Sequence, residues 1–185
     1  MSKPGYVVWM NGFPGVGKYT IAKELRRLLP ASVLVDNHSL IDRVTLARDH
    51  PDYNGEREKV RDAAYTRLLH PATDEESECG DREEQLRQIV IFTGTKWSTA
   101  PRTAAEKAGR PFLPVYVSCT KEENLNRVAS PGRQTGERKK LTDVKMVEDF
   151  VDKLKTFRFA DLGLDLDVTA LTAEEAAKRI VEAMK

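Results

Sequence analysis

The chain has 185 residues, a length that suits a single domain (1–185) with a sizeable buried core. Its 30 Lys and Arg residues nearly balance 29 Asp and Glu residues, and the net charge of +1 excludes a strong field toward nucleic acid or an anionic membrane. The two cysteines and three histidines show no disulfide or zinc spacing, and no apolar run approaches the ~20 residues of a membrane span. We therefore expect a cytoplasmic protein whose partner is a small molecule, with no nucleic-acid or membrane partner and the oligomeric state left open.

The first predicted element is a strand over residues 6–10, followed by the glycine-rich run GFPGVGKYT and a helix that Pro30 ends. This is the pattern of a phosphate-binding loop, or Walker A motif. Its glycines let successive backbone N–H groups face phosphate oxygens, and its Lys neutralises the β- and γ-phosphates. The residues predicted to bind nucleotide are Gly12, Phe13, Pro14, Gly15, Val16, Gly17, Lys18, Tyr19 and Thr20.

The residue after the lysine departs from the strict pattern. Ser or Thr is expected there to hold Mg²⁺, but the chain has Tyr19, and the hydroxyl follows at Thr20. This departure favours adenylate-kinase-like enzymes over GTPases. We expect Thr20 to be the metal ligand.

Strands and helices alternate along the rest of the chain. Two helical pieces within residues 40–69, broken near 50–55, follow the second strand, and later helices are expected over 98–108 and after Thr120, Thr142 and Thr172. Such alternation predicts an α/β fold of three layers, a P-loop fold with a five-stranded parallel sheet and helices on both faces. The four further strands are predicted over residues 32–35, 88–93, 112–118 and 164–168.

The chain resembles small P-loop kinases of the nucleotide-kinase-like group, and in particular the chloramphenicol-phosphotransferase-like branch. The resemblance covers nearly the whole length and implies transfer of the γ-phosphate of ATP, with Mg²⁺, to a hydroxyl group of a small-molecule acceptor. It is carried by Gly12–Thr20, by Asp36 after the second strand, by Cys119–Glu123 leading to Arg127 and Arg133, and by residues 166–172.

In this family the acidic residue after the second strand takes the proton from the acceptor hydroxyl, and Asp36 matches that position. Independently, ligands of open α/β sheets bind at the carboxyl ends of the strands, where Asp36 is expected. The alternative is that Asp36 only caps a turn or helix before Ser39.

The resemblance also implies a mobile basic lid, at about residues 130–141. Arg127 matches the position whose guanidinium lies against the adenine, and Arg133 matches a lid arginine that reaches the transferring phosphate. Arginines that clamp the phosphoryl oxygens stabilise the charge of the transition state. The alternative for this stretch is a solvated basic loop.

Three further residues are candidates for the acceptor site. His38 and Arg43 follow Asp36 on the same segment, although His38 is equally explained as a polar loop residue. In related kinases the loop after the third strand supplies a basic residue to the acceptor, which makes Lys96 a candidate. The third strand ends without an acidic residue, so Mg²⁺ would depend on Thr20, the phosphates, water and Asp36.

Two other functions stay open at this point. A nucleoside or nucleotide kinase would share the loop and the lid, although residues 40–69 show no recognisable arginine pattern for a monophosphate. A nucleotide-binding module without phosphotransfer would explain the missing acidic residue of the third strand. A nucleic-acid-end kinase is disfavoured by the neutral charge. The acceptor, and ATP rather than GTP as donor, are not decided by any motif.

Overall fold

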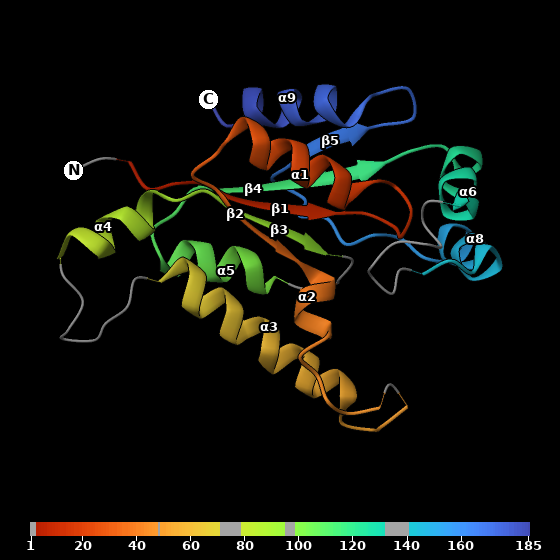
Figure 1. Ribbon diagram of the computed structural model, residues 1–185, viewed down its shortest axis with the longest axis horizontal. Coiled ribbons are helices and arrows are strands. Elements are labelled where there is room, and N and C mark those ends of the chain that lie inside the picture. Colours follow the sequence, from red (N-terminus) through yellow and green to blue (C-terminus); the bar gives the residue numbers. More distant parts are fainter. Residues whose placement is uncertain (1–2, 48, 71–78, 95–98, 132–140) are drawn as a thin grey trace.

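The centre of the computed structural model is a parallel sheet of five strands in the order β2-β3-β1-β4-β5 (Figure 1). The structure describes residues 3–47, 49–70, 79–94, 99–131 and 141–185, with the backbone alone for 79–82. This confirms the predicted α/β fold and its five parallel strands. The strands are β1 Val7–Asn11, β2 Val33–Asp36, β3 Val90–Gly94, β4 Phe112–Ser118 and β5 Leu164–Asp167.

Helices cover both faces of this sheet (Figure 1). Val8 and Met10 of β1 belong to the core beneath α1 (Lys18–Leu28) and α9 (Ala173–Ala183). Val7 and Trp9 belong to a second core, against α3 (Tyr53–Leu69) and α5 (Ala100–Lys107). Because both faces are covered, β1 is buried at all five positions, and its first four residues are apolar where a half-exposed strand would alternate.

Two of the three helix caps predicted from the sequence are observed. Thr120 accepts a hydrogen bond from the Glu123 backbone N–H at the start of α6 (Lys121–Ala129), and Thr172 and Glu175 form the expected capping box of α9. α8 (Val144–Lys153) differs, because its cap is Asp143 and not Thr142. The Asp143 carboxylate accepts from the Met146 N–H at 3.0 Å.

Three further helices differ from the prediction. α2 is short, Asn37–Ile41, and begins directly after β2, while α3 begins at Tyr53 and continues through Gly55. α4 (Cys79–Arg87) was not expected, because its sequence has few apolar residues and little helical periodicity. Helices α2 and α3 lie on the side of the sheet where an acceptor site is expected.

The segment between α8 and β5 returns along the face that α3 and α5 cover. Phe157 and Phe159 meet the Trp9 ring edge-to-face, with centroids 6.3 and 6.0 Å away. The Tyr116 hydroxyl donates to the Leu162 carbonyl at 2.9 Å and fixes the same segment to β4. This packing anchors the end of α8 beside the carboxyl end of β1.

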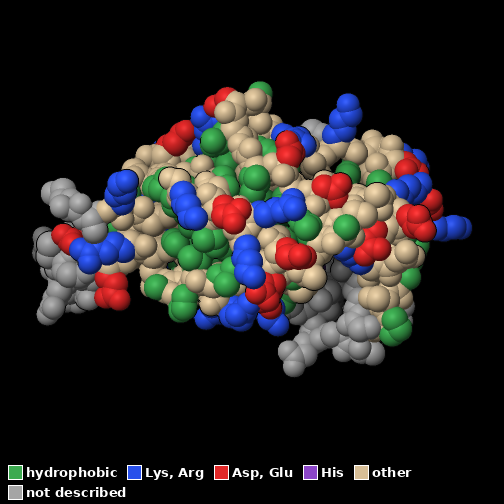
Figure 2. All heavy atoms as spheres, turned by 90° about the horizontal axis from the view of Figure 1, so that it is seen from above, with side chains coloured by type: hydrophobic (Ala, Val, Ile, Leu, Met, Phe, Trp, Pro, Cys, Tyr) green, Lys and Arg blue, Asp and Glu red, His purple; other side chains and the backbone are tan. Residues whose placement is uncertain are grey.

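The opposite face of the molecule, formed by α1 and α9, mixes acidic and basic side chains (Figure 2). Glu174 illustrates the pattern, since it pairs with Lys178 at 2.8 Å and with Arg27 at 3.5 Å. Among the residues described on this face, acidic and basic side chains are therefore interspersed, with no patch of a single charge. Over the described ranges, no helix combines the length and apolar character needed to cross a membrane.

Candidate active site

The loop between β1 and α1 has the backbone that phosphate binding requires. Gly15 and Gly17 have φ values of 97° and 98°, which residues with a side chain rarely adopt. A Cβ atom at Gly15 would also lie 2.3 Å from Oδ1 of Asn124 on α6. The sequence therefore needs glycine here for two reasons, the turn itself and its close packing on α6.

Lys18 is the first residue of α1 and its side chain lies back along the loop. Its Nζ donates to the carbonyl oxygens of Gly12 at 2.7 Å and Phe13 at 2.8 Å. The ammonium is thus held at the rim of the loop, where nucleotide phosphates are expected to lie.

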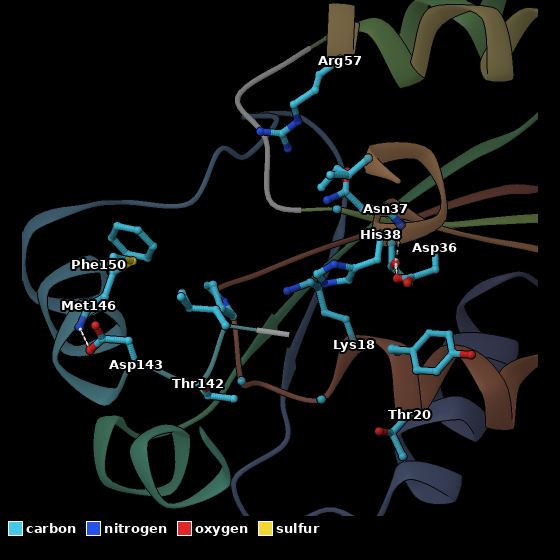
Figure 3. Close-up of a pocket in the computed structure, with 18 of the residues that line it drawn as sticks. Lys18, Thr20, Asp36, Asn37, His38, Arg57, Thr142, Asp143, Met146 and Phe150 are labelled. Carbon is cyan, nitrogen blue, oxygen red and sulfur yellow. Dashed lines mark hydrogen bonds between the residues drawn. The ribbon is translucent and has the colours of Figure 1, made fainter. Parts of the chain in front are cut away.

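A cavity of about 730 Å³ opens in front of this loop (Figure 3). It is bounded by the loop and the first turn of α1, by the carboxyl ends of β2 and β3, by α2 and α3, and by α8. Ligands of parallel α/β sheets bind at this edge. The predicted loop residues that line it are Pro14, Gly15, Gly17, Lys18, Tyr19 and Thr20.

Asp36 lies in the floor of the cavity and is 6% exposed. Its Oδ1 accepts a hydrogen bond of 2.6 Å from the Thr93 hydroxyl, which itself accepts from the Asn37 backbone N–H at 3.4 Å. Asp36 stands at the N-cap position of α2, but its side chain makes no capping hydrogen bond. The carboxylate therefore faces the cavity floor and β3 instead of capping the helix.

The structure separates the other candidates of this segment. His38 lines the cavity with Asp36, whereas Arg43 borders a different hollow, beside residues 50–60. In place of Arg43, α3 brings Tyr53 and Arg57 to the cavity, with the guanidinium carbon of Arg57 5.6 Å from the Tyr53 ring centroid. The cavity thus has a basic and aromatic wall opposite the loop (Figure 3).

Arg127 extends from α6 to the back of the phosphate loop. It donates to the Val16 carbonyl at 3.1 Å, to the Val168 carbonyl at 2.8 Å and to the Glu123 carboxylate at 2.7 Å. One guanidinium therefore joins the loop, α6 and the segment after β5. The structure shows the guanidinium of Arg127 at the loop; the contact with an adenine ring that the sequence predicts stays a prediction.

Helix α8 forms the wall across from Asp36. Met146 and Phe150 line the cavity from this helix, and Asp143 stands at its start (Figure 3). Lys121 of α6 holds the helix through Asp152 at 2.7 Å and Glu148 at 3.0 Å. The predicted lid residue Arg133, the predicted acceptor residue Lys96 and most of the predicted lid lie outside the described residues.

The donor atoms suit magnesium bound mainly by nucleotide phosphates. Mg²⁺ commonly keeps several waters and takes one or two protein oxygens. Thr20 and Asp36 supply a hydroxyl and a carboxylate to one cavity. Within the described part of the chain, no group of three or more His, Cys, Asp or Glu side chains is arranged to hold a metal ion.

Comparison with known proteins finds similarity in structure and not in sequence. No protein-family model matches the chain, and no curated protein matches it significantly. Among solved structures, a gluconokinase from Sinorhizobium meliloti 1021 is 14% identical with a TM-score of 0.57, covering 99% of this chain and 97% of its own. The APS kinase of Mycobacterium tuberculosis, in complex with AMPPNP and APS, is 16% identical with a TM-score of 0.59 and 98% of both chains covered.

A putative kinase from Chloroflexus aurantiacus has a TM-score of 0.65 at 12% identity, again over 98% of both chains. The chain has the fold of the P-loop kinases. At these identities the likeness is one of fold, and the chloramphenicol-phosphotransferase-like branch within this fold stays a prediction.

Sequence reasoning missed three polar residues of this P-loop kinase fold: Thr93, Tyr53 and Arg57. The sequence does place Thr93 at the end of the predicted third strand, where an acidic residue would be expected to help bind Mg²⁺, so a polar side chain at this position was a usable signal. Tyr53 and Arg57 stand one helical turn apart on α3, a spacing that places them on one face. Which way that face points was decided by the packing of α3 on β3.

Proposed function

We propose that this protein is an ATP-dependent phosphotransferase that moves the γ-phosphate to a hydroxyl group of a small-molecule acceptor. The observation that carries the proposal is a single cavity, lined both by the loop proposed to bind the nucleotide and by the carboxylate proposed to act as base. Lys18 and the glycine loop border it on one side, and the buried carboxylate of Asp36 lies in its floor. The fold shared with solved kinases supports the same assignment.

In this proposal, Asp36 accepts the proton of the acceptor hydroxyl while the acceptor oxygen forms a bond to the γ-phosphorus. The bond from that phosphorus to the β–γ bridging oxygen breaks, and ADP leaves with the electron pair. Thr93 donates to Oδ1 of Asp36 and so fixes the orientation of the carboxylate that receives the proton. Thr93 is thus a positioning residue in this reaction.

Charge builds up on the phosphoryl oxygens during transfer, and the chain supplies cations and backbone donors for it. Lys18 would exchange its contacts with the loop carbonyls for the β- and γ-phosphates. Thr20 and Asp36, which line the same cavity, would hold Mg²⁺, which would neutralise phosphate charge. Arg133 keeps its proposed role at the transferring phosphate, and His38 and Lys96 keep theirs at the acceptor.

Acceptor-dependent release of ADP tests the proposal. A library of metabolites and antibiotics is assayed with the wild-type protein and Lys18→Ala, which lacks the phosphate-binding ammonium. We expect at least one compound to release ADP with the wild-type protein only, at a rate roughly 10²–10³-fold above that of the variant. Lys23→Ala, an exposed lysine of the same helix, is the matched control and should retain the rate.

The same assay separates the alternatives. Transfer to nucleosides or nucleotides alone would identify a nucleoside or nucleotide kinase. Tight binding of AMPPNP by calorimetry, with no compound that stimulates ADP release, would favour a nucleotide-binding module and contradict the proposal.

A further inference from the structure

A second cavity lies beneath the phosphate loop, between the loop and the end of α8. Its volume is about 250 Å³, and its walls are mainly apolar. Phe13 and Pro14 of the loop form one side, and Phe150 of α8 and Leu154, which directly follows that helix, form the other. An apolar cavity of about 150 Å³ is already large enough for benzene, so this one can hold an aromatic ring or a short branched chain.

Asn11, the last residue of β1, is the buried polar residue of this cavity, which Lys155 and Thr156 also line. Asn11 is 1% exposed, and its Nδ2 donates to the Phe157 carbonyl at 2.8 Å. That bond fixes the orientation of the amide, so the remaining polar atom is Oδ1. Oδ1 is buried and accepts no hydrogen bond from any residue that the structure describes. A buried amide oxygen without a donor is unfavourable, and a ligand that brings a donor would correct this.

The position of the cavity connects it with the candidate active site. Pro14 and Phe150 line both cavities, so the two spaces share a wall of one loop residue and one aromatic ring of α8. A side chain in that wall can turn without any change in the backbone. A molecule with its hydroxyl group near Asp36 could then extend past Phe150 toward Asn11.

We propose that this cavity is a subsite for the acceptor. The cavity binds the apolar end of the acceptor molecule, and Oδ1 of Asn11 accepts a hydrogen bond from that end. The inference rests on the proposed phosphotransfer and names the acceptor class as a hydroxyl compound with a small apolar end that carries a hydrogen-bond donor. A fully polar polyol would leave Phe13, Leu154 and Phe157 without a partner in this space.

Phenol and fluorobenzene are suitable probes, because they have nearly the same shape and only phenol carries a donor. Each is titrated without nucleotide into ¹⁵N-labelled protein, and the side-chain amide signal of Asn11 reports on the cavity by NMR. We expect phenol to shift this signal saturably and to bind about fivefold more tightly than fluorobenzene, the ordinary effect of one hydrogen bond. Equal affinity for the two probes, or an Asn11 signal that does not move, would overturn the subsite.

Two substitutions, one directly after α8 and one at its start, locate the binding. Leu154→Trp places a large ring at the cavity and should weaken phenol binding at least fivefold. Val144→Trp is the control, because Val144 is an exposed residue of α8 that lines neither cavity. If phenol binds Leu154→Trp as it binds the wild type, its site is elsewhere.

Kinetics then relate the cavity to the acceptor. Saturating phenol should raise the KM for an acceptor found by the ADP-release screen and leave the KM for ATP unchanged. An unchanged acceptor KM would show that the cavity is not part of the acceptor site. Phenol binding is measured without turnover, so a failure of the subsite is distinguishable from a failure of the proposed phosphotransfer, which appears as absent ADP release.

Discussion

The two edges of the sheet each use an arginine to join three segments, but in different surroundings. At the carboxyl edge, Arg127 joins the phosphate loop, α6 and the segment after β5, and its side chain is 27% exposed. At the amino edge, Arg110 is 4% exposed and donates to the carbonyls of Gly5 at 3.1 Å, Leu68 at 3.3 Å and Gln88.

The partners of the two guanidinium groups explain the difference. All three hydrogen bonds of Arg110 go to backbone carbonyls, and burial lowers the pKa of its guanidinium to about 10, so it is still charged at neutral pH. Arg127 has a carboxylate partner in Glu123 and stays partly open to solvent. The amino edge is therefore closed, which favours stability, whereas the carboxyl edge is held in place but remains accessible to a ligand.

The largest effect is expected for Asp36→Asn, which tests whether the carboxyl edge of the sheet serves function. The amide has the shape of the carboxylate but does not accept a proton, so we expect kcat to fall about 10²–10⁴-fold. The affinity for AMPPNP, measured by calorimetry, should hardly change. Asp42→Asn is the control, because Asp42 directly follows α2, is exposed and lines no cavity described here. A wild-type kcat in Asp36→Asn would remove Asp36 from the role of base.

Arg110→Met should produce the complementary result at the amino edge. The substitution keeps an apolar chain but leaves three carbonyls without their donor, so we expect a loss of roughly 3 kcal/mol in the free energy of unfolding. For a domain of this size that corresponds to a fall in Tm of about 6–12 °C. Below the transition, kcat should stay within about twofold of the wild type. Arg26→Met on the exposed face of α1 is the control, and an equal Tm for the two variants would contradict the structural role of Arg110.

Arg127 tests whether one residue can support both nucleotide binding and the stability of the fold. Arg127→Met should weaken AMPPNP binding about tenfold, because the loop loses its support from α6, and should lower stability by only about 1 kcal/mol. Arg127→Lys keeps the charge but not the planar fork that reaches two carbonyls at once. If Lys restores the affinity completely, the charge of Arg127 matters and its positioning of the loop does not.

The smallest effect is expected at Thr93. Thr93→Val has the same shape without the hydroxyl, so the Asp36 carboxylate loses its fixed orientation, and we expect kcat to fall about fivefold. The KM for ATP should stay constant, and Thr93→Ser should restore kcat. A fall in kcat that Ser does not reverse would indicate a packing effect instead.

Much of the fold was predictable because it depends on local patterns. The glycine loop, the apolar strand before it and the amphipathic helix after it lie within 30 residues, and each has a local physical cause. The caps at Thr120 and Thr172 were readable for the same reason. At α8, Thr142 and Asp143 are both good capping residues, and the sequence alone did not choose between them.

The candidate site was predictable only where it follows directly from an element end. Asp36 follows β2 and so had to lie at the carboxyl edge of the sheet. Arg43 is only seven residues further, but the end of α2 at Ile41 turns the chain away, and the structure places Arg43 beside another hollow. The approach of Arg57 depends on how α3 packs, a long-range property that local periodicity does not contain.

The sequence by itself determined that this protein has a glycine-rich loop between a strand and a helix, five parallel strands and an acidic residue after the second strand, since glycine conformation and apolar periodicity act over a few residues. The tertiary structure alone decided what surrounds them. It paired Asp36 with Thr93 across 57 positions, attached Arg127 to the loop across 111, and placed Asn11 beside a cavity closed by α8. Such contacts arise from strand order and helix packing, which bring together residues that no local pattern relates.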